Sequence, residues 1–273
     1  MKTLFISDLD GTLLQNDARI SAKSCEILNR LIERGISFSY ATARGFETAL
    51  HVTEGLHVNM PVITKNGVVT VRPDTGELLA KNTFSKDEAE DIYHILNKWM
   101  LSPVVYSYQD GKEKFSYNGN VQSEGVRWFV SEHKNDRRDN PVSGDDEMLS
   151  GEVFYFSCIG TKEMLEDAFQ EIRRRYRCIF SKDTYNDWIW LEIMPEYATK
   201  ASAVLQMKEM LGYDYIVAFG DGINDMPMFE IADECYAVEN AVNKLKKMAT
   251  GIIMSNQSDG VADWLQKNSG RYV

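Results

Sequence analysis

Two aspartates directly follow an apolar run of strand length at the amino terminus. The run covers residues 3–7, and the chain then reads Asp-Leu-Asp-Gly-Thr from Asp8 to Thr12. Residues i and i+2 of an extended chain point the same way, and Gly11 lets the backbone leave the strand sharply. Asp8 and Asp10 can therefore face one small volume, at the strand end where open α/β sheets place their chemistry. Two like charges that close need a divalent cation or a shared proton, and without further support a surface turn is an equal alternative.

The chain on both sides of residues 84–194 alternates strands with helices. The pattern before this section predicts strands at 3–7, 36–41 and 62–64, a helix between a Ser21 cap and Gly35, and a helix from Phe46. After it come a helix at 200–211, a strand at 215–219, a helix following Asp225 and a short strand at 251–254. Strands that alternate with helices imply parallel strands joined by right-handed crossovers. The two segments are therefore predicted to form one α/β core.

The middle section has a different order, helix–strand–strand, and shows it twice. Its first copy is a helix through Ala89 and Trp99 with strands at 104–108 and 114–117, which the turn at Asp110-Gly111 makes antiparallel. A polar stretch at 132–150, broken by Pro141, predicts a surface loop. A strand at 153–158 precedes the second copy, which is a helix at 162–176 with strands at 178–181 and 188–194. This order predicts a separate α+β unit inserted into the core.

Composition excludes several classes of protein. With 273 residues, 44% of them hydrophobic and 26% charged, the chain is a soluble globular protein of one large or two ordinary domains. No apolar stretch reaches spanning length and no signal-peptide pattern is present, so we expect a cytoplasmic protein without a membrane partner. The net charge of −11 argues against nucleic acid as a partner. The four cysteines are Cys25, Cys158, Cys178 and Cys235. Their positions match neither the spacing of zinc ligands nor a Cys-x-x-Cys redox motif, which indicates buried thiols in a reducing compartment.

Polar residues follow each predicted core strand at its carboxyl end. Thr42, Ala43 and Arg44 follow the second strand, Lys65, Asn66 and Gly67 the third, and the Gly-Asp-Gly-Ile-Asn-Asp run of 220–225 the fourth. Lys200 opens the helix that returns from the insertion. Because these strand ends share one edge of the sheet, the side chains should converge there. They bring a hydroxyl and two cations suited to an oxyanion beside four carboxylates suited to a hard cation: Asp8, Asp10, Asp221 and Asp225.

These motifs resemble those of the haloacid dehalogenase superfamily of phosphatases, in its Cof-type branch with a large α/β cap. The match covers the whole core: Asp-x-Asp-Gly-Thr at 8–12, the threonine motif at Thr42, the lysine at Lys200 and Gly-Asp-x-x-Asn-Asp at 220–225, with further likeness at 240–246 and 259–261. The resemblance implies an α/β fold, a Rossmann-like parallel-sheet core with an inserted α+β cap domain. The core is expected at 1–83 and 195–273 and the cap at 84–194.

The resemblance also implies a role for each residue. Asp8 is the nucleophile that forms an aspartyl-phosphate, and Asp10 protonates the leaving oxygen and then activates water. Mg²⁺ is held by the carboxylates of Asp8 and Asp221 and by the backbone carbonyl of Asp10, while Asp225 supports these ligands. The expected phosphate and substrate contacts are Thr42, the N–H groups of Leu9 and Ala43, Arg44, Asn66, Lys200 and Asn224.

Each of these residues also has a purely structural interpretation. The Thr42 hydroxyl could bond its own backbone. Lys200 could be a solvated residue, although a lysine in a first helical turn opposes the helix dipole, and Asp225 could cap the helix that follows it. Arg44 could lie at the surface. The family often has a glycine before this arginine, and Ala43 keeps the backbone donor but restricts positive φ.

The last strand of the insertion has two different faces. One face is aliphatic and suits packing on the cap helices; it carries Ile189, Leu191 and Ile193. The other face carries two tryptophans and a glutamate, which are Trp188, Trp190 and Glu192. Aromatic faces suit stacking on sugar rings, so the second face is expected to set substrate specificity. The alternative is that these three side chains are buried in the cap or in a subunit contact.

The sequence therefore predicts a Mg²⁺-dependent phosphomonoesterase acting on a small phosphorylated metabolite such as a sugar phosphate. The nearest alternative is a phosphomutase, which would need a cationic phosphate site in the cap. A non-catalytic phosphoryl switch needs slow dephosphorylation, and the Asp10 acid–base position argues against it. A silent ligand-binding relative is disfavoured because every catalytic position is filled. The sequence leaves the physiological substrate and the oligomeric state open.

Overall fold

The computed structural model describes residues 1–120, 123–183 and 185–272. The chain folds into two compact units. The core unit comprises Met1–Lys81 and Ala198–Val273, and the inserted unit comprises Asn82–Tyr197. No helix in the described ranges is long and apolar enough to cross a membrane.

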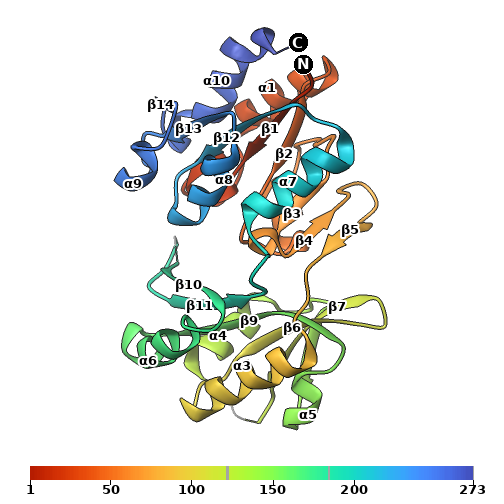
Figure 1. Ribbon diagram of the computed structural model, residues 1–273, viewed down its shortest axis with the longest axis vertical. Coiled ribbons are helices and arrows are strands. Elements are labelled where there is room, and N and C mark those ends of the chain that lie inside the picture. Colours follow the sequence, from red (N-terminus) through yellow and green to blue (C-terminus); the bar gives the residue numbers. More distant parts are fainter. Residues whose placement is uncertain (121–122, 184, 273) are drawn as a thin grey trace. The chain divides into compact units, whose positions relative to one another are not determined.

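The core unit is built on a parallel sheet of five strands in the order β14-β13-β12-β1-β2 (Figure 1). The strands are β1 (Thr3–Ser7), β2 (Ser37–Tyr40), β12 (Tyr215–Gly220), β13 (Glu234–Val238) and β14 (Gly251–Ile253). Every residue of β1 is buried because the strand lies between two neighbours, as its continuous apolar run predicts. The predicted α/β fold class, a parallel-sheet core with an inserted α+β unit, is confirmed.

The helix α1 of the core unit begins and ends at the residues that its capping signals indicate. Ser21 caps α1, where its side chain accepts a hydrogen bond from the Ser24 amide, and Gly35 ends the helix region with a φ of 96°. Lys200 is the first residue of α7. The helices are α1 (Ala22–Glu33), α2 (Phe46–Val52), α7 (Lys200–Leu211), α8 (Met226–Ile231), α9 (Asn243–Lys246) and α10 (Gly260–Asn268).

The third predicted strand departs from the parallel arrangement. It forms β3 (Val62–Thr64), whose parallel contact with the main sheet is a single bridge between Ala41 and Ile63. Its ladder is antiparallel, in a small sheet of order β3-β4-β5 with β4 (Val69–Val71) and β5 (Leu78–Lys81). The chain reverses immediately after β3 because Lys65, Asn66 and Gly67 all have positive φ. Two successive non-glycine residues in that region are uncommon, so the pattern of apolar residues does not predict this turn.

The inserted unit is a six-stranded sheet of order β10-β11-β9-β6-β7-β8, antiparallel except for the β7–β8 pair. Its strands are β6 (Val104–Gln109), β7 (Lys112–Asn118), β8 (Asp139–Val142), β9 (Glu152–Gly160), β10 (Arg177–Lys182) and β11 (Ile189–Met194). Its helices are α3 (Lys86–Lys98), α4 (Glu124–Glu132), α5 (Asp145–Met148) and α6 (Lys162–Ile172). The predicted hairpin turn at Asp110 and Gly111 is present, and both residues have positive φ.

The segment 132–150, predicted to be a loop, contains the short strand β8 and the helix α5. β8 is the edge strand of its sheet and pairs only with β7 in the described part of the chain. Edge strands tolerate proline, because one side of the strand needs no partner, and so Pro141 does not prevent pairing here. The polar composition of the segment reflects this exposed edge rather than a lack of regular structure.

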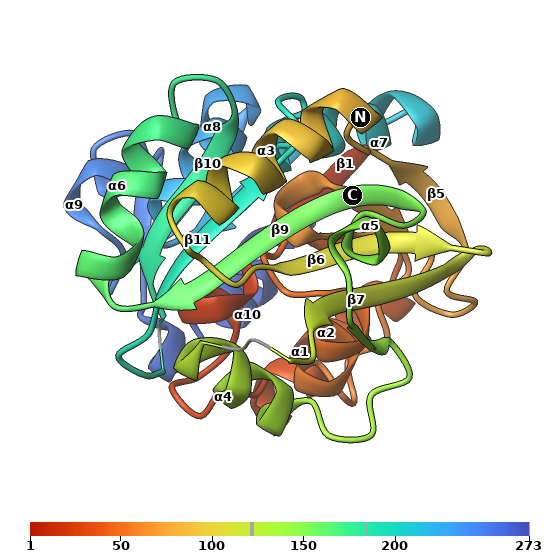
Figure 2. The same ribbon diagram turned by 90° about the horizontal axis from the view of Figure 1, so that it is seen from below.

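Helices cover both faces of the inserted sheet. The helices α3 and α6 lie side by side on one face (Figure 2), where Ile92 and Leu165 share a buried cluster with Leu191 and Ile193 of β11. Alternate residues of a strand face opposite ways, so Trp190 points to the other face. There its ring contacts Phe129 of α4. The aliphatic face of β11 packs as predicted, and α4, a helix that was not predicted, covers part of the second face.

The close approach of α4 to this sheet depends on Gly125. A Cβ atom at Gly125 would lie 2.1 Å from the carbonyl oxygen of Ile159 in β9. We expect Gly125→Ala to lower the free energy of unfolding by about 1–3 kcal/mol, because the backbone must shift to admit a methyl group. Alanine would otherwise stabilise a helix by about 0.5–1 kcal/mol relative to glycine, so the sign of the change is diagnostic. Urea unfolding followed by circular dichroism measures it.

Gly160 provides the matched control. It follows Ile159 in β9, and a Cβ added to it would lie 3.6 Å from the nearest side chains, which is an ordinary contact distance. Gly160→Ala should change the free energy of unfolding by less than about 0.5 kcal/mol. A Gly125→Ala protein as stable as the wild type would show that α4 does not pack closely on β9.

Candidate active site

Asp8 is held at the carboxyl end of β1 by the strand's own hydrogen bonding. Its amide donates to the carbonyl of Phe219 in the neighbouring strand at 2.9 Å, and its side chain is buried. Gly11 then turns the chain with a φ of 79°, and a Cβ there would lie 2.4 Å from a carboxylate oxygen of Asp221. The glycine is therefore required twice, for the turn and for the approach of Asp221.

Three carboxylates meet at this edge of the sheet. Asp8, Asp221 and Asp225 each offer one oxygen, and these oxygens lie within 4.8 Å of one another. The Lys200 ammonium reaches into the group, with Nζ 2.5 Å from Asp8 Oδ1 and 2.7 Å from Asp225 Oδ1. Lys200 is 1% exposed, so this lysine is not solvated. The side chains come from the ends of β1 and β12 and from the first residue of α7.

Asp225 organises the loop after β12. Its Oδ2 accepts hydrogen bonds from the amides of Asp221 at 3.0 Å and Gly222 at 2.9 Å, while Oδ1 accepts from Lys200. A Cβ at Gly220 would lie 2.8 Å from the Asp225 side chain, which explains the glycine there. Asp225 directly precedes α8, yet its side chain makes no capping hydrogen bond to that helix. Its carboxylate therefore fixes the position of Asp221 and not the start of α8.

The charges in this cluster are out of balance. Burial, followed by the neighbouring carboxylates, raises the pKa of Asp8 well above its usual value although Lys200 opposes the shift. Burial and the charge of Asp225 raise the pKa of Asp221 to about 7. Burial alone would lower the pKa of Lys200, but Asp225 and Asp8 raise it above its ordinary value. The single lysine is thus charged and does not offset the carboxylates around it.

The carboxylate of Asp10 is directed to Arg44, apart from the three grouped carboxylates. The Arg44 guanidinium donates from Nε to Asp10 Oδ2 at 2.8 Å and from Nη2 to Oδ1 at 2.6 Å. Arg44 is therefore not a surface arginine: its side chain is 21% exposed and that of Asp10 22%. The Thr42 hydroxyl accepts a hydrogen bond from the Arg44 amide at 3.1 Å, so the structural interpretation of Thr42 also holds.

Two asparagines lie next to the cluster. The Asn224 side-chain amide donates to Asn66 Oδ1 at 3.3 Å, and the Asn66 amide donates to the carbonyl of Thr42 at 2.9 Å. The chain at Gly67 touches the start of α7, since a Cβ there would lie 2.1 Å from the Thr199 carbonyl oxygen. Asn66 Nδ2 is buried and has no partner in the described part of the chain. A buried donor without an acceptor is costly, which indicates that a ligand supplies the acceptor.

Several contacts of the site are not evident from the motifs. Thr12 donates from its hydroxyl to Asp221 Oδ1 at 3.1 Å. Asn240 donates to the carbonyl of Gly11 at 2.7 Å, which ties the loop after β13 to the turn after β1. Thr12 belongs to the first motif, so its position in the sequence could have predicted that it lies in the site. Nothing in the spacing of the motifs predicts the hydrogen-bond partner of Asn240. Leu9 and Ala43 follow Asp8 and Thr42 in the chain, and their backbone amides therefore stand beside those residues.

The three predicted specificity residues lie in the inserted unit. Trp188 and Trp190 are half-buried and both contact the ring of Trp128 in α4. The Trp190 indole also donates to Asp183 at 3.0 Å, and Glu192 accepts a hydrogen bond from the Tyr155 hydroxyl. The three residues thus belong to one aromatic and polar surface that also includes α4.

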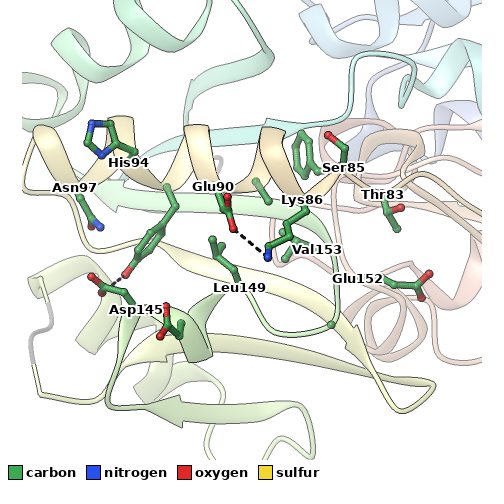
Figure 3. A pocket seen from close by; sticks show the side chains of 15 residues that line it. Thr83, Ser85, Lys86, Glu90, His94, Asn97, Asp145, Leu149, Glu152 and Val153 are labelled. Carbon is green, nitrogen blue, oxygen red and sulfur yellow. Dashed lines mark hydrogen bonds and ion pairs between the residues drawn. The ribbon is translucent and has the colours of Figure 1, made fainter.

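The inserted unit also contains a cavity of about 770 Å³ between α3 and the segment around α5 (Figure 3). The Tyr93 hydroxyl donates to Asp145 at 2.7 Å, and Lys86 lies 3.6 Å from Glu90. The four buried polar atoms that lack partners in the described ranges are all elsewhere. The cavity therefore shows paired polar groups on a helix surface and no catalytic arrangement.

Comparison with known proteins places the chain in a family. The family model of the haloacid dehalogenase-like hydrolases matches residues 5–265. The Bacillus subtilis protein named 5-amino-6-(5-phospho-D-ribitylamino)uracil phosphatase YwtE is 28% identical over 100% of both chains. A second phosphatase of that name from the same organism, YitU, is 23% identical over 97% of this chain and 96% of its own.

Solved structures share the fold of the whole chain. A crystal structure from Thermotoga maritima has a TM-score of 0.78 at 24% identity and covers 98% of this chain and 97% of its own. A haloacid dehalogenase-like hydrolase from Bacteroides thetaiotaomicron has a TM-score of 0.80 at 22% identity, with 98% and 99% covered. The resemblance drawn from the sequence motifs is thereby confirmed, and the chain belongs to the haloacid dehalogenase-like hydrolase family.

Proposed function

We propose that this phosphatase of the haloacid dehalogenase-like hydrolase family is a Mg²⁺-dependent phosphomonoesterase that acts on a small phosphorylated metabolite such as a sugar phosphate. The observation that carries the proposal is the group of Asp8, Asp221 and Asp225 around Lys200. It supports the proposal because a carboxylate of this group can act as a nucleophile, the others can serve as metal ligands, and a cation lies beside them.

The donor set fits Mg²⁺. The ligands are hard oxygen atoms, and they are close enough to share one ion. Burial, followed by neighbouring carboxylates, raises the pKa values of Asp8 and Asp221, and a divalent cation would stabilise their anionic forms. Asp8 and Asp221 would hold the ion with the Asp10 backbone carbonyl, and Asp225 would fix Asp221. Bound there, Mg²⁺ would neutralise charge on the phosphoryl oxygens.

The chain's own residues account for the two steps of hydrolysis. In the first step a carboxylate oxygen of Asp8 bonds to phosphorus, the ester bond breaks, and Asp10 gives its proton to the leaving oxygen. In the second step Asp10 takes a proton from water, water oxygen bonds to phosphorus, and the bond to Asp8 breaks. Asp10 returns to its protonated form, so the cycle is balanced.

The remaining groups hold the phosphoryl oxygens. Lys200 contributes a buried positive charge, and Asn66 Nδ2 contributes a donor that has no other partner in the described residues. Thr42, Asn224 and the backbone amides of Leu9 and Ala43 complete the proposed set. These donors are fixed by strand ends and turns before substrate binds, which lowers the cost of reorganisation during transfer.

We expect hydrolysis of small phosphate monoesters in the presence of Mg²⁺, and complete loss of turnover in Asp8→Asn. An amide is a poor nucleophile and a weaker metal ligand than a carboxylate. The assay is phosphate release from a panel of sugar phosphates, other phosphorylated metabolites and 5-amino-6-(5-phospho-D-ribitylamino)uracil, the compound in the names of two relatives.

Asp8→Asn, purified in the same way, is the control for contaminating phosphatases. Wild-type activity in that variant would contradict the covalent mechanism. Transfer of phosphate between two positions of one substrate, without release, would instead identify a phosphomutase.

The pH dependence of stability should report the buried carboxylates. A carboxyl whose pKa is raised to about 7 in the folded protein, from an ordinary value near 4, binds its proton more tightly when folded. The folded state therefore loses stability as pH rises from about 4 to about 7 in metal-free protein. Asp221→Asn removes this titration. The free energy of unfolding of the variant, measured relative to that of the wild type, should therefore increase by about 2 kcal/mol as the pH is raised from 5 to 8.

Chemical unfolding of both proteins in EDTA measures that difference. Titrating groups that do not interact with Asp221 cancel because the two chains share them. The charge of Asp221 also raises the pKa of Asp8, so the loss of that effect in the variant changes the difference in the same direction. A constant difference across the pH range would contradict the raised pKa of Asp221. With Mg²⁺ added at pH 8, the wild type should gain more stability than Asp221→Asn, since the variant has lost an anionic ligand.

We propose further that the aromatic surface of the inserted unit sets substrate choice. Trp188→Ala and Trp190→Ala should change the relative kcat/KM among phosphorylated substrates by roughly 1–3 kcal/mol, the value of a stacked or apolar contact. Mg²⁺ binding and hydrolysis of a small generic phosphate ester should be spared. The measurement is kcat/KM across the substrate panel.

Trp99→Ala is the matched control, because Trp99 packs on the helical cluster of α3 and α6 in the same unit. It should leave the order of substrates unchanged. If Trp188→Ala and Trp190→Ala fold normally and also leave the order unchanged, these tryptophans are structural and pack against α4 only.

A further inference from the structure

The pairing of Arg44 with Asp10 is specific in geometry. Two nitrogen atoms of one guanidinium face the two oxygens of one carboxylate, at 2.8 Å for Nε to Oδ2 and 2.6 Å for Nη2 to Oδ1. This fork-to-fork arrangement is stronger and more directional than a contact between point charges. It fixes the plane of the ionised Asp10 carboxylate as well as its distance. When one oxygen carries the proton, the other can still accept a hydrogen bond from Arg44.

The backbone of Arg44 is held as firmly as its side chain. Its amide donates to the Thr42 hydroxyl at 3.1 Å, and its carbonyl accepts from the Lys65 amide at 3.0 Å. The Asn66 amide in turn donates to the Thr42 carbonyl. The end of β2 and the turn after β3 therefore secure the base of this side chain, and they are the same elements that carry the proposed phosphate ligands Thr42 and Asn66.

Asp10 lies in the turn that follows β1. It precedes Gly11, whose φ of 79° belongs to this turn. Its side chain is 22% exposed and lies outside the group formed by Asp8, Asp221 and Asp225. Arg44, 34 residues away in sequence, donates to both of its carboxylate oxygens and so helps to orient them.

We propose that Arg44 is a positioning residue that acts through Asp10, holding its carboxylate for proton transfer, and that it is not a ligand of the substrate phosphate. This proposal rests on the proposed function, because it concerns the proton that Asp10 gives to the leaving oxygen. A general acid accelerates a reaction only when its proton lies within hydrogen-bond reach of the leaving atom, so the orientation of the carboxylate matters.

The proposal separates substrates by their leaving groups. An alkyl phosphate releases an alkoxide, which must be protonated as the ester bond breaks, whereas p-nitrophenyl phosphate releases a phenolate that is stable without a proton. A residue that orients the general acid should therefore affect the first substrate and spare the second. A residue that binds the phosphate should affect both alike, since both carry the same phosphoryl group.

The test compares kcat/KM for these two substrates in Arg44→Gln and Arg44→Lys. The ratio kcat/KM reports the steps up to release of the leaving group, and thus the step in which Asp10 is the acid. We expect Arg44→Gln to lose about 100-fold with the best alkyl phosphate of the panel and less than about 5-fold with p-nitrophenyl phosphate. Arg44→Lys keeps the charge but not the fork and should be intermediate.

A double-mutant cycle with Asp10→Asn completes the experiment. If Arg44 acts through Asp10, Arg44→Gln should cause no further loss of kcat/KM for the alkyl phosphate in the Asp10→Asn background. Arg30→Gln is the matched control in the same unit, since Arg30 makes an exposed ion pair with Glu26, and it should leave both substrates unaffected. Thermal unfolding of each variant verifies folding.

Equal losses with both substrates, or a full additional loss in the Asp10→Asn background, would overturn the positioning role and make Arg44 a phosphate ligand. A wild-type protein that hydrolyses neither ester would instead contradict the proposed function. The two failures are therefore distinguishable, because the first requires a working phosphatase and the second is seen before any substitution is made.

Discussion

The ion pairs of Lys200 with Asp8 and Asp225 are the interaction on which the rest of the site depends. A buried lysine with a raised pKa stays charged, and the two carboxylates that face it compensate the loss of hydration. Removing one partner of such a group usually costs about 3–5 kcal/mol. The lysine also connects distant parts of the chain, because it begins α7 while its partners end β1 and follow β12. Folding of the core unit thereby assembles the site.

The charge of the site explains its chemistry as well as its stability. Three grouped carboxylates, two of them buried, lie around one lysine, and burial together with their mutual repulsion raises the pKa values of Asp8 and Asp221. In the proposed function, a divalent cation would compensate these carboxylates, and a phosphate group would supply an acceptor for Asn66 Nδ2, which has no partner among the described residues. The proposal of a phosphatase site therefore follows from the same imbalance that makes the metal-free site costly to bury.

Much of this arrangement could be predicted from the sequence because strand ends at one edge of a parallel sheet must converge. That rule predicts a group of Asp8, Asp10, Asp221 and Asp225, and three of these carboxylates, those of Asp8, Asp221 and Asp225, do lie together. It could not predict that Asp10 turns to Arg44, since side-chain pairing depends on rotamers and not on topology. It also missed the antiparallel sheet of β3, β4 and β5, because the positive φ values at Lys65 and Asn66 leave no trace in the pattern of apolar residues. The helix α4 was also missed, although Ser123 caps it and Val126 and Phe129 form its buried face, so its sequence does carry the usual helix signals.

The proposed reaction depends on a covalent bond between the Asp8 carboxylate and phosphorus during hydrolysis. Rapid quenching of turnover with Mg²⁺, followed by borohydride reduction and mass spectrometry of the peptide that contains Asp8, tests for this bond directly. We expect Asp8 to be reduced to homoserine in protein that is turning over substrate and not in protein without substrate. Phosphate release with an unmodified Asp8, or modification at another carboxylate, would contradict it.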